Sequence, residues 1–187
     1  MGAGPAMTSG QIALLVLAAV LVFWMLGAYN RLVALRHTIS IAWAQVDEVL
    51  QRRGAAIEPL AAALRGTLLA EQGALDALLA AQARLAAAAV ALREQPVRAE
   101  CAQALVAAEA ALAPAASRVI SLAEQQRGAL HDEATAPSLA ALGEAVPKLV
   151  FARQRFNDAV AAYNEAVAQW PTFLLARLVG FSPAAPL

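Results

Sequence analysis

Two rows of residues spaced seven apart run through the C-terminal part of the chain and constrain its fold more than any other feature. The first row is Leu142, Leu149, Phe156, Tyr163 and Trp170, and the second is Leu139, Val146, Arg153, Val160 and Val167. Two such rows form the apolar seam of a helix that packs against other helices. Because proline cannot continue a helix, Pro171 predicts that this helix ends near Trp170.

Residues 11–29 form an uncharged apolar run, QIALLVLAAVLVFWMLGAY, which is long enough to cross a bilayer as a helix. Trp24 and Tyr29 lie toward one end of it, where interfacial aromatic residues are common. A cleaved signal peptide, the alternative, would carry positive charge before the run, and this chain has none there. We therefore expect a flexible N-terminus over residues 1–10 and a retained transmembrane helix over residues 11–29.

The basic residues that flank this run predict which way it crosses the membrane. No Lys or Arg precedes it, whereas Arg31 and Arg36 follow it closely. By the positive-inside rule, the N-terminus then lies outside and the rest of the chain lies in the cytoplasm. The sequence therefore predicts a single-pass membrane protein with a cytoplasmic domain.

The pattern between these two features predicts more helix. The first helix should continue without a break, with Leu32, Ile39 and Val46 in one row, and should bend near Gly54 and Pro59. Later helices are expected over residues 74–94, 97–127 and 138–170, with kinks or breaks at Pro114 and Pro147. Four long helices joined by short turns favour an all-α fold, an antiparallel up-down-up-down four-helix bundle over residues 30–170.

The same topology predicts one ion pair. Asp47 lies about 17 positions after the start of the bundle and Arg153 about 17 positions before its end, so antiparallel packing places them at one level. Arg153 is the only charge in its seam and needs a partner. We expect an Asp47–Arg153 pair, with Arg155 as the alternative donor.

Composition and motifs exclude several functions. The 187 residues carry 14 basic and 14 acidic side chains, so the chain has no electrostatic footprint for nucleic acid. The single cysteine, Cys101, allows no internal disulfide. No phosphate loop, nucleophile elbow or zinc-protease motif occurs, and His131, Asp132 and Glu133 lack a fourth metal ligand. We therefore expect no catalytic residue, no cofactor, no metal site and no enzymatic activity.

Two blocks of the sequence resemble a known family. The first runs from YNRLVALR at Tyr29 through AWAQVD at Ala42 to the pair Arg52-Arg53. The second is RQRFNDAVAAYN, which begins at Arg153, followed by the segment WPTFLLARLVGF. Together they closely resemble the LemA family. The chain departs from the family at Gly54, where an aromatic residue is usual, and in its Pro-Ala-Ala-Pro-Leu end, where the family is aromatic.

The resemblance implies a helical bundle behind an anchor in the bacterial inner membrane. Some similar proteins carry a lipoprotein cysteine at the corresponding place, so a periplasmic bundle is the alternative orientation. Residues in the matching blocks are candidates for structure or interaction. They are Tyr29, Asn30, Trp43, Asp47, Arg52, Arg53, Arg153, Phe156, Asn157, Tyr163, Asn164, Trp170, Pro171, Gly180 and Phe181.

Residues 171–187 form an apolar tail that has two alternative roles. In the predicted topology the last long helix returns toward the membrane, which brings the tail close to the bilayer surface. The tail then lies in the membrane interface, or it folds back and caps the open end of the bundle.

Two functions of different class fit these features. One is a scaffold that self-assembles or organises the membrane, because Ala-rich faces let helices approach closely and an anchor concentrates copies in two dimensions. The other, implied by the resemblance, is an adaptor or sensor for a specific membrane protein such as a membrane protease. Both predict the lipid bilayer, and either copies of this chain or other membrane proteins, as partners.

Overall fold

A computed structural model describes residues 8–126 and 132–187. Its elements in chain order are α1 (Ser9–Leu64), the short 3-10 helix η1 (Leu69–Glu71), α2 (Gln72–Glu94), α3 (Ala99–Gln125), α4 (Ala136–Ala168) and α5 (Thr172–Val179). No strand occurs in the described residues, so the predicted all-helical class is confirmed. Most of the expected flexible segment 1–10 lies outside the described residues, and so does His131.

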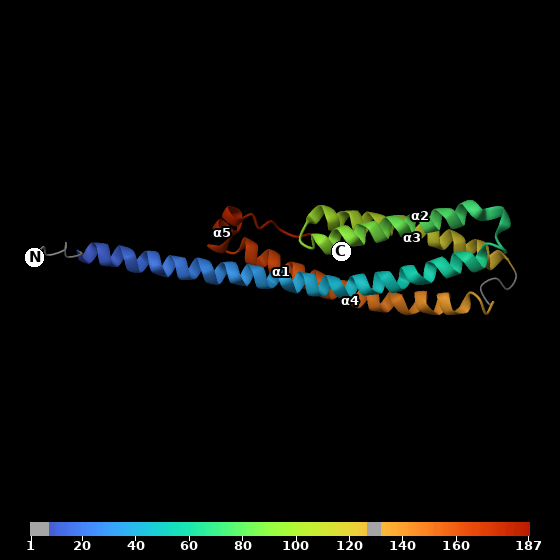
Figure 1. The fold of residues 1–187 in the computed structure, drawn as a ribbon, viewed down its shortest axis with the longest axis horizontal. Coiled ribbons are helices and arrows are strands. Elements are labelled where there is room, and N and C mark those ends of the chain that lie inside the picture. Colours follow the sequence, from blue (N-terminus) through green and yellow to red (C-terminus); the bar gives the residue numbers. More distant parts are fainter. Residues whose placement is uncertain (1–7, 127–131) are drawn as a thin grey trace, which may run out of the picture.

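The long helices lie side by side along one axis (Figure 1). α4 packs antiparallel along α1, α2 and α3 form a second antiparallel pair, and α2 also packs against α1. The N-terminal part of α1 extends beyond the other helices. The packed part of the molecule therefore begins only where α4 and α5 reach α1.

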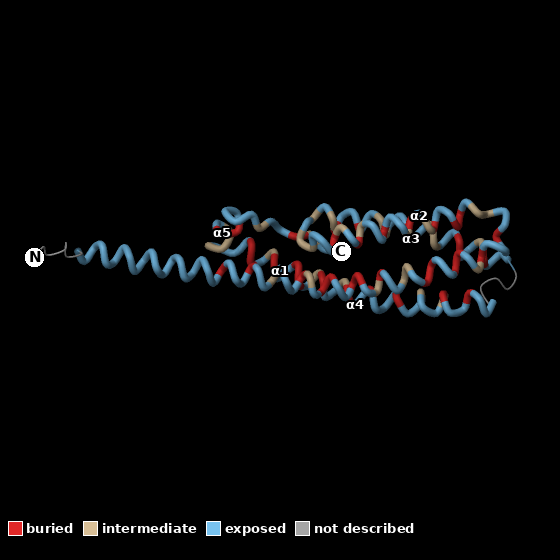
Figure 2. Tube along the Cα trace, in the orientation of Figure 1, coloured by how far each residue is buried: buried red, intermediate tan, exposed pale blue. Residues whose placement is uncertain are grey.

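Burial along α1 follows the predicted seven-residue row. Leu32, Ile39 and Val46 are fully buried, and Trp43 packs edge-on against Phe156 with ring centroids 6.1 Å apart. From Ser9 to Gly27 every residue of the same helix is exposed (Figure 2). The core therefore depends on the periodic part of α1, in which apolar residues share one face.

The helices run through their internal prolines without a break. α1 is continuous past Gly54 and Pro59, as expected, and α3 and α4 are continuous past Pro114 and Pro147, where a kink or a break was expected. A proline removes one helical hydrogen bond, and packing against neighbouring helices offsets this loss.

Two members of the C-terminal rows do not belong to the core. Val146 and Trp170 are 62% and 76% exposed, whereas Phe156 and Tyr163 are fully buried as expected. An α-helix drifts by about 20° per seven residues, so a strict row leaves the core after a few turns. Accordingly Ala145 is buried in place of Val146, and Trp170 lies beyond the end of α4.

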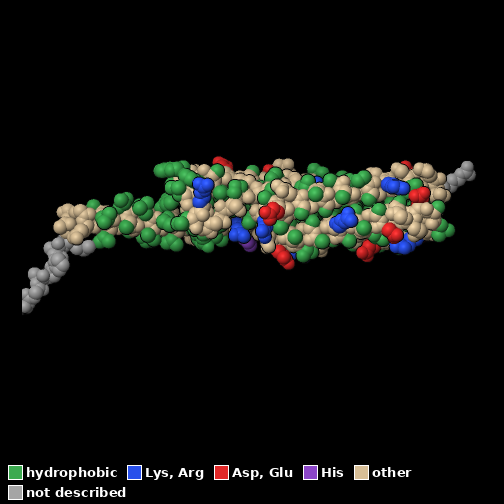
Figure 3. Space-filling view, turned by 90° about the horizontal axis from the view of Figure 1, so that it is seen from above, with side chains coloured by type: hydrophobic (Ala, Val, Ile, Leu, Met, Phe, Trp, Pro, Cys, Tyr) green, Lys and Arg blue, Asp and Glu red, His purple; other side chains and the backbone are tan. Residues whose placement is uncertain are grey.

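Within residues 8–126 and 132–187, three helical segments are long and apolar enough to cross a membrane by length and composition alone: Ser9–Leu64, Leu69–Glu94 and Ala99–Gln125. They differ in how much of their most apolar window is buried within the protein. The share is 0% for the first, 33% for the second and 17% for the third. Figure 3 shows that the surface differs in the same way along the molecule. Hydrophobic side chains lie over the projecting part of α1, whereas charged side chains lie on the rest of the surface in view.

Candidate functional site

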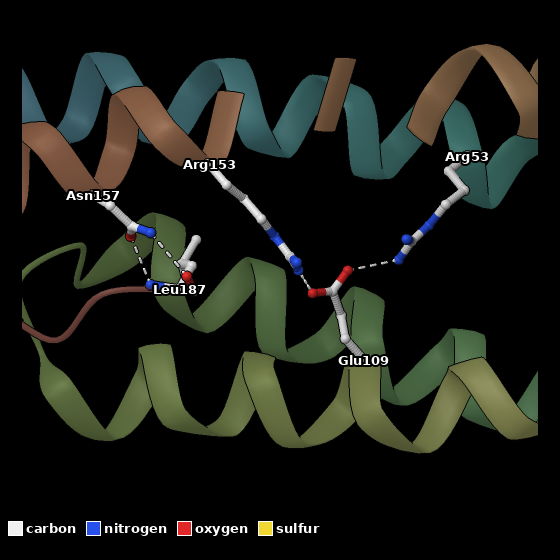
Figure 4. A network of polar contacts seen from close by, with 5 residues as sticks. All are labelled: Arg53, Glu109, Arg153, Asn157 and Leu187. Carbon is white, nitrogen blue, oxygen red and sulfur yellow. Dashed lines mark hydrogen bonds and ion pairs between the residues drawn. The ribbon is translucent and has the colours of Figure 1, made fainter. Parts of the chain in front are cut away.

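Three charged side chains from three helices meet inside the packed part of the molecule (Figure 4). Glu109 of α3 accepts a hydrogen bond at 3.0 Å from Arg53 of α1, and its second carboxylate oxygen pairs with Arg153 of α4. We call this cluster the charged centre. It is one of the polar contacts between the α2–α3 pair and the α1–α4 pair, and it joins α3 to both α1 and α4.

The charged centre is mostly shielded from solvent. The side chains of Arg53, Glu109 and Arg153 are 18%, 13% and 31% exposed. Burial lowers the pKa of both arginines, and the charge of Arg53 lowers the pKa of Arg153 further. One carboxylate therefore compensates two guanidinium groups, and the loss of that carboxylate would leave two partly buried like charges.

Sequence reasoning identified the two arginines but missed Glu109. The pattern around it carried a usable indication, because Glu109 lies four residues after Leu105 and three before Leu112. Both leucines are buried, so a carboxylate between them on the same helical face had to find a partner inside.

The predicted Asp47–Arg153 pair is wrong. Asp47 instead binds Arg93 of α2, with Oδ2 2.7 Å from one guanidinium nitrogen and 2.9 Å from Nε, and accepts a bond from Gln51. Level along the axis does not determine which face of a helix a residue occupies. Asp47 and Arg53 lie six residues apart, roughly 120° around the helix, so Asp47 faces α2 while Arg53 faces α3.

The last residues of the chain are held by side chains of α4. Asn164 donates to the carbonyl of Ala184 and accepts from its N–H, both at 2.8 Å. Asn157 makes the same two bonds to Leu187, at 2.9 and 2.8 Å, and the hydroxyl of Tyr163 donates to the carbonyl of Ser182 at 3.0 Å. We call Asn157, Tyr163 and Asn164 the tail clasp.

The spacing of the clasp matches the spacing of the tail. Seven helical residues separate the two asparagines, a rise of about 10.5 Å. Three residues separate Ala184 from Leu187, about 9–10 Å in an extended or polyproline chain. Each of these two tail residues directly follows a proline, in the sequence Ser-Pro-Ala-Ala-Pro-Leu. Proline disfavours helix in the residue before it, so this sequence favours the extended conformation that the clasp requires.

In the clasp, Asn157 and Asn164 hold the tail, and this bears on whether the tail lies in the membrane interface or folds back on the helices. Ala184 is buried in the core, so residues 182–187 fold back on the bundle, as the capping alternative expected. Gly180 makes this return, because its φ of 83° is a conformation that residues with a side chain rarely adopt. The Pro-Ala-Ala-Pro-Leu end, a departure from the family pattern, supplies the tail residues that the clasp holds.

A second group of candidates gathers where α5 meets α1. The ring of Phe181 packs edge-on against Tyr29 at 5.9 Å, and Arg31 donates to Gln169 at the end of α4. Trp170 and Pro171 form the turn before α5, and Asn30 is exposed beside Tyr29. These residues mark the boundary between the projecting and packed parts of α1. Arg52 is not part of either group, since it is exposed and pairs with Glu48 on its own helix.

A groove of about 590 Å³ lies between α1 and α2. Most of its lining is alanine and leucine, and Asp47, Gln82 and Arg93 contribute polar groups. Oδ1 of Asp47 and Oε1 of Gln82 are buried and have no hydrogen-bond partner among the described residues. Gly54 lines the same groove, where a Cβ would lie 2.4 Å from Nε2 of Gln82.

No cluster of three or more His, Cys, Asp or Glu side chains that could hold a metal occurs within residues 8–126 and 132–187. Cys101 is a free cysteine packed against the core. The site therefore offers ion pairing, backbone recognition and apolar contact, which are the elements of a binding or assembly surface.

A comparison with models of protein families identifies the family of this chain. The family model described as LemA family matches residues 42–187, which span the packed helices, the charged centre and the clasp. The chain belongs to the LemA family, as its sequence blocks indicated. No curated protein matches the chain.

Proposed function

We propose that this LemA-family chain is a non-enzymatic, membrane-anchored scaffold that self-assembles to organise the membrane. In this proposal residues 11–29 cross a bacterial inner membrane once. The four long helices behind them form an up-down-up-down bundle in the cytoplasm. The observation that carries the proposal is the uninterrupted exposed apolar surface from Ile12 to Leu26.

The length and composition of this segment support an anchor. It has 19 residues, all exposed, and its most apolar window has none of its residues buried inside the protein. About 20 apolar helical residues match the thickness of a hydrocarbon core. Exposed Leu, Val and Phe side chains at this density are costly in water and stable in lipid.

The position of α5 supports a membrane interface at the end of the anchor. Leu175 packs near Val22 and Tyr29, whereas Leu174 and Leu178 are 57% and 78% exposed. Trp170 is exposed at the start of the same short helix. We propose that α5 lies on the bilayer surface with this apolar side toward lipid, as amphipathic interfacial helices do.

Sidedness can be tested with two single cysteines in a Cys101→Ala background. Ser9→Cys and Ala134→Cys are both exposed and lie at opposite ends of the molecule, whereas Thr135 is buried and would label poorly. With a membrane-impermeant maleimide on intact cells, we expect Ser9→Cys to label and Ala134→Cys to label only after lysis. The opposite result would reverse the orientation to a periplasmic bundle. Labelling of both in intact cells would contradict the anchor.

Self-assembly is tested on the full chain in lipid nanodiscs or detergent by native mass measurement. We expect oligomers that persist on dilution below the concentration of the purified stock. A strict monomer at every concentration would contradict the scaffold.

The α1–α2 groove favours a second candidate, an adaptor or sensor for another membrane protein. Its apolar lining and its two unpartnered oxygens suit a partner segment that donates hydrogen bonds. Ala83→Leu would fill the groove, whereas Ala87→Leu, exposed on the same helix outside it, is the matched control. If this candidate is correct, a partner that co-purifies at a fixed ratio is lost from the first variant and kept by the second.

A further inference from the structure

The tail clasp has the chemistry of a peptide-binding site. It holds the tail through main-chain atoms, since Asn157 and Asn164 each bond both the N–H and the main-chain oxygen of one tail residue. Tyr163 adds a bond to a third main-chain oxygen, that of Ser182. Such contacts recognise an extended chain by its conformation, and they do not depend on which molecule supplies that chain.

The ligand that fits this site is an extended segment with proline at every third position. A seven-residue helical interval matches a three-residue extended interval, so both asparagines can bond only to a chain with that rise. A proline before each bonded residue favours the extended conformation. Because proline has no N–H, it also leaves no backbone donor without a partner at its own position. The side chain of Ala184 is buried, so a small residue is required at the first bonded position.

We propose that the tail of a second copy of this chain can occupy the clasp, so that residues 182–187 link adjacent copies. This inference rests on the proposed self-assembly and names the contact that would produce it. Every neighbouring copy carries the matching segment, and exchange of identical segments keeps the same five hydrogen bonds.

The anchor and the length of the tail make this exchange geometrically feasible. Copies anchored in one membrane hold their clasps at the same height above it, and confinement raises their effective concentration. The three residues between Gly180 and Ala184 reach about 10 Å when extended. The eight residues of α5 add about 12 Å if the helix moves with the tail. The total equals about two helix diameters, the separation of directly adjacent bundles.

A complementation experiment tests the exchange on full anchored chains with different affinity tags. One variant ends at Phe181, which frees its clasp but keeps the ring contact with Tyr29. The other carries Asn157→Ala and Asn164→Ala, which disable its clasp but keep its tail. We expect the two variants to co-purify about tenfold or more above either variant paired with itself, because only the mixed pair can make the bidentate bonds.

Two controls keep the result interpretable. Gln154→Ala removes an exposed amide of α4 outside the clasp and should leave association unchanged. A synthetic peptide of residues 181–187 should release the mixed pair, because it competes for the free clasp. If the double alanine variant does not fold by circular dichroism, the single variant Asn164→Ala replaces it.

The outcomes separate the inference from the proposed function. If wild-type copies associate but the mixed pair is no better than its own controls, self-assembly stands and tail exchange is wrong. If the mixed pair forms while wild-type copies stay monomeric, the clasp accepts a second chain and the scaffold proposal fails. If neither the wild-type copies nor the mixed pair associate, both the tail exchange and the scaffold proposal are wrong.

Discussion

The two parts of α1 belong to one continuous helix, yet they differ in charge and in environment. Residues 9–27, which we call the anchor segment after the role proposed for them above, are exposed throughout. From Ala28 to Leu64 buried residues recur mostly at intervals of three, four or seven positions, and this part of the helix packs against α4 and α2. The two parts differ in how their apolar residues are spaced. An apolar stripe along one face of a helix packs against other helices, whereas a helix that is apolar all round is stable in an apolar solvent but has no preferred packing face.

This comparison separates two kinds of hydrophobic stabilisation in one helix. In the packed body, which comprises residues 28–187, apolar side chains fill space between helices, so their shape matters. In the anchor segment we expect lipid to surround them, so their apolar character matters more than their shape. Substitutions that change size should therefore affect the packed body, and substitutions that add charge should affect the anchor segment.

The largest expected effect tests the packed body with a matched phenylalanine pair. Phe156→Ala leaves a cavity beside Trp43 and should lower the free energy of unfolding by about 3–5 kcal/mol. Phe23→Ala removes the same side chain from the anchor segment, where it is 75% exposed, and should leave that free energy nearly unchanged. Chemical denaturation of both variants in detergent measures the difference. Equal losses of unfolding free energy in the two variants would contradict the difference between the packed body and the anchor segment.

The charged centre should be the next most sensitive position. Glu109→Gln leaves Arg53 and Arg153 partly buried without a counter-charge, which should cost about 3 kcal/mol of stability. Glu124→Gln, exposed near the end of the same helix, should cost almost nothing. Thermal unfolding of the two variants compares them. A Glu109→Gln protein as stable as the wild type would show that water solvates the two arginines.

A charge in the anchor segment should produce the reverse pattern. Leu17→Arg should disfavour membrane insertion by about 2.5–3.5 kcal/mol, whereas Leu17→Ala should be tolerated. The packed body should keep its stability in both variants, because Leu17 is exposed. Membrane fractionation together with circular dichroism measures the two effects. Loss of helical structure in Leu17→Arg would mean that the anchor segment does contribute to folding.

The tail clasp should contribute less than the core. Asn164→Ala removes both bonds to Ala184 and should lower the free energy of unfolding by about 1–3 kcal/mol. Limited proteolysis should then release the tail before the helices are cut. Resistance of the tail in this variant would show that Ala184 is held by apolar contact alone.

The smallest effect concerns pH. Burial raises the pKa of Tyr163, and the charge of Arg36 opposes this in part, so the folded state holds the hydroxyl proton more tightly than the unfolded state. The resulting stability is complete below about pH 10 and is lost as pH rises through the higher folded pKa. Tyr163→Phe should cost about 1 kcal/mol at neutral pH, and its difference from the wild type should shrink in alkali. A constant difference measured in denaturant titrations across that range would contradict the effect.

The sequence predicted much of the fold but less of the site. The seven-residue rows correctly placed Leu32, Ile39, Phe156 and Tyr163 in the core, because helical periodicity is a local property. Arg53 and Arg153 were identified as candidates, but their shared partner was not. The partner lies on α3, and the rotation of each helix about its axis is determined only when all the helices pack together.

Local sequence thus determined the all-helical class, the exposed apolar run in the first part of α1 and the family. Tertiary structure decided the contacts, including Asp47 with Arg93, Glu109 with two arginines, and α4 with the chain end. Those contacts join residues separated by 19 to 56 positions, and their formation depends on how helices rotate and how Gly180 turns the chain back. Periodicity within a helix shows which residues face inward, and packing between helices determines what each of them meets.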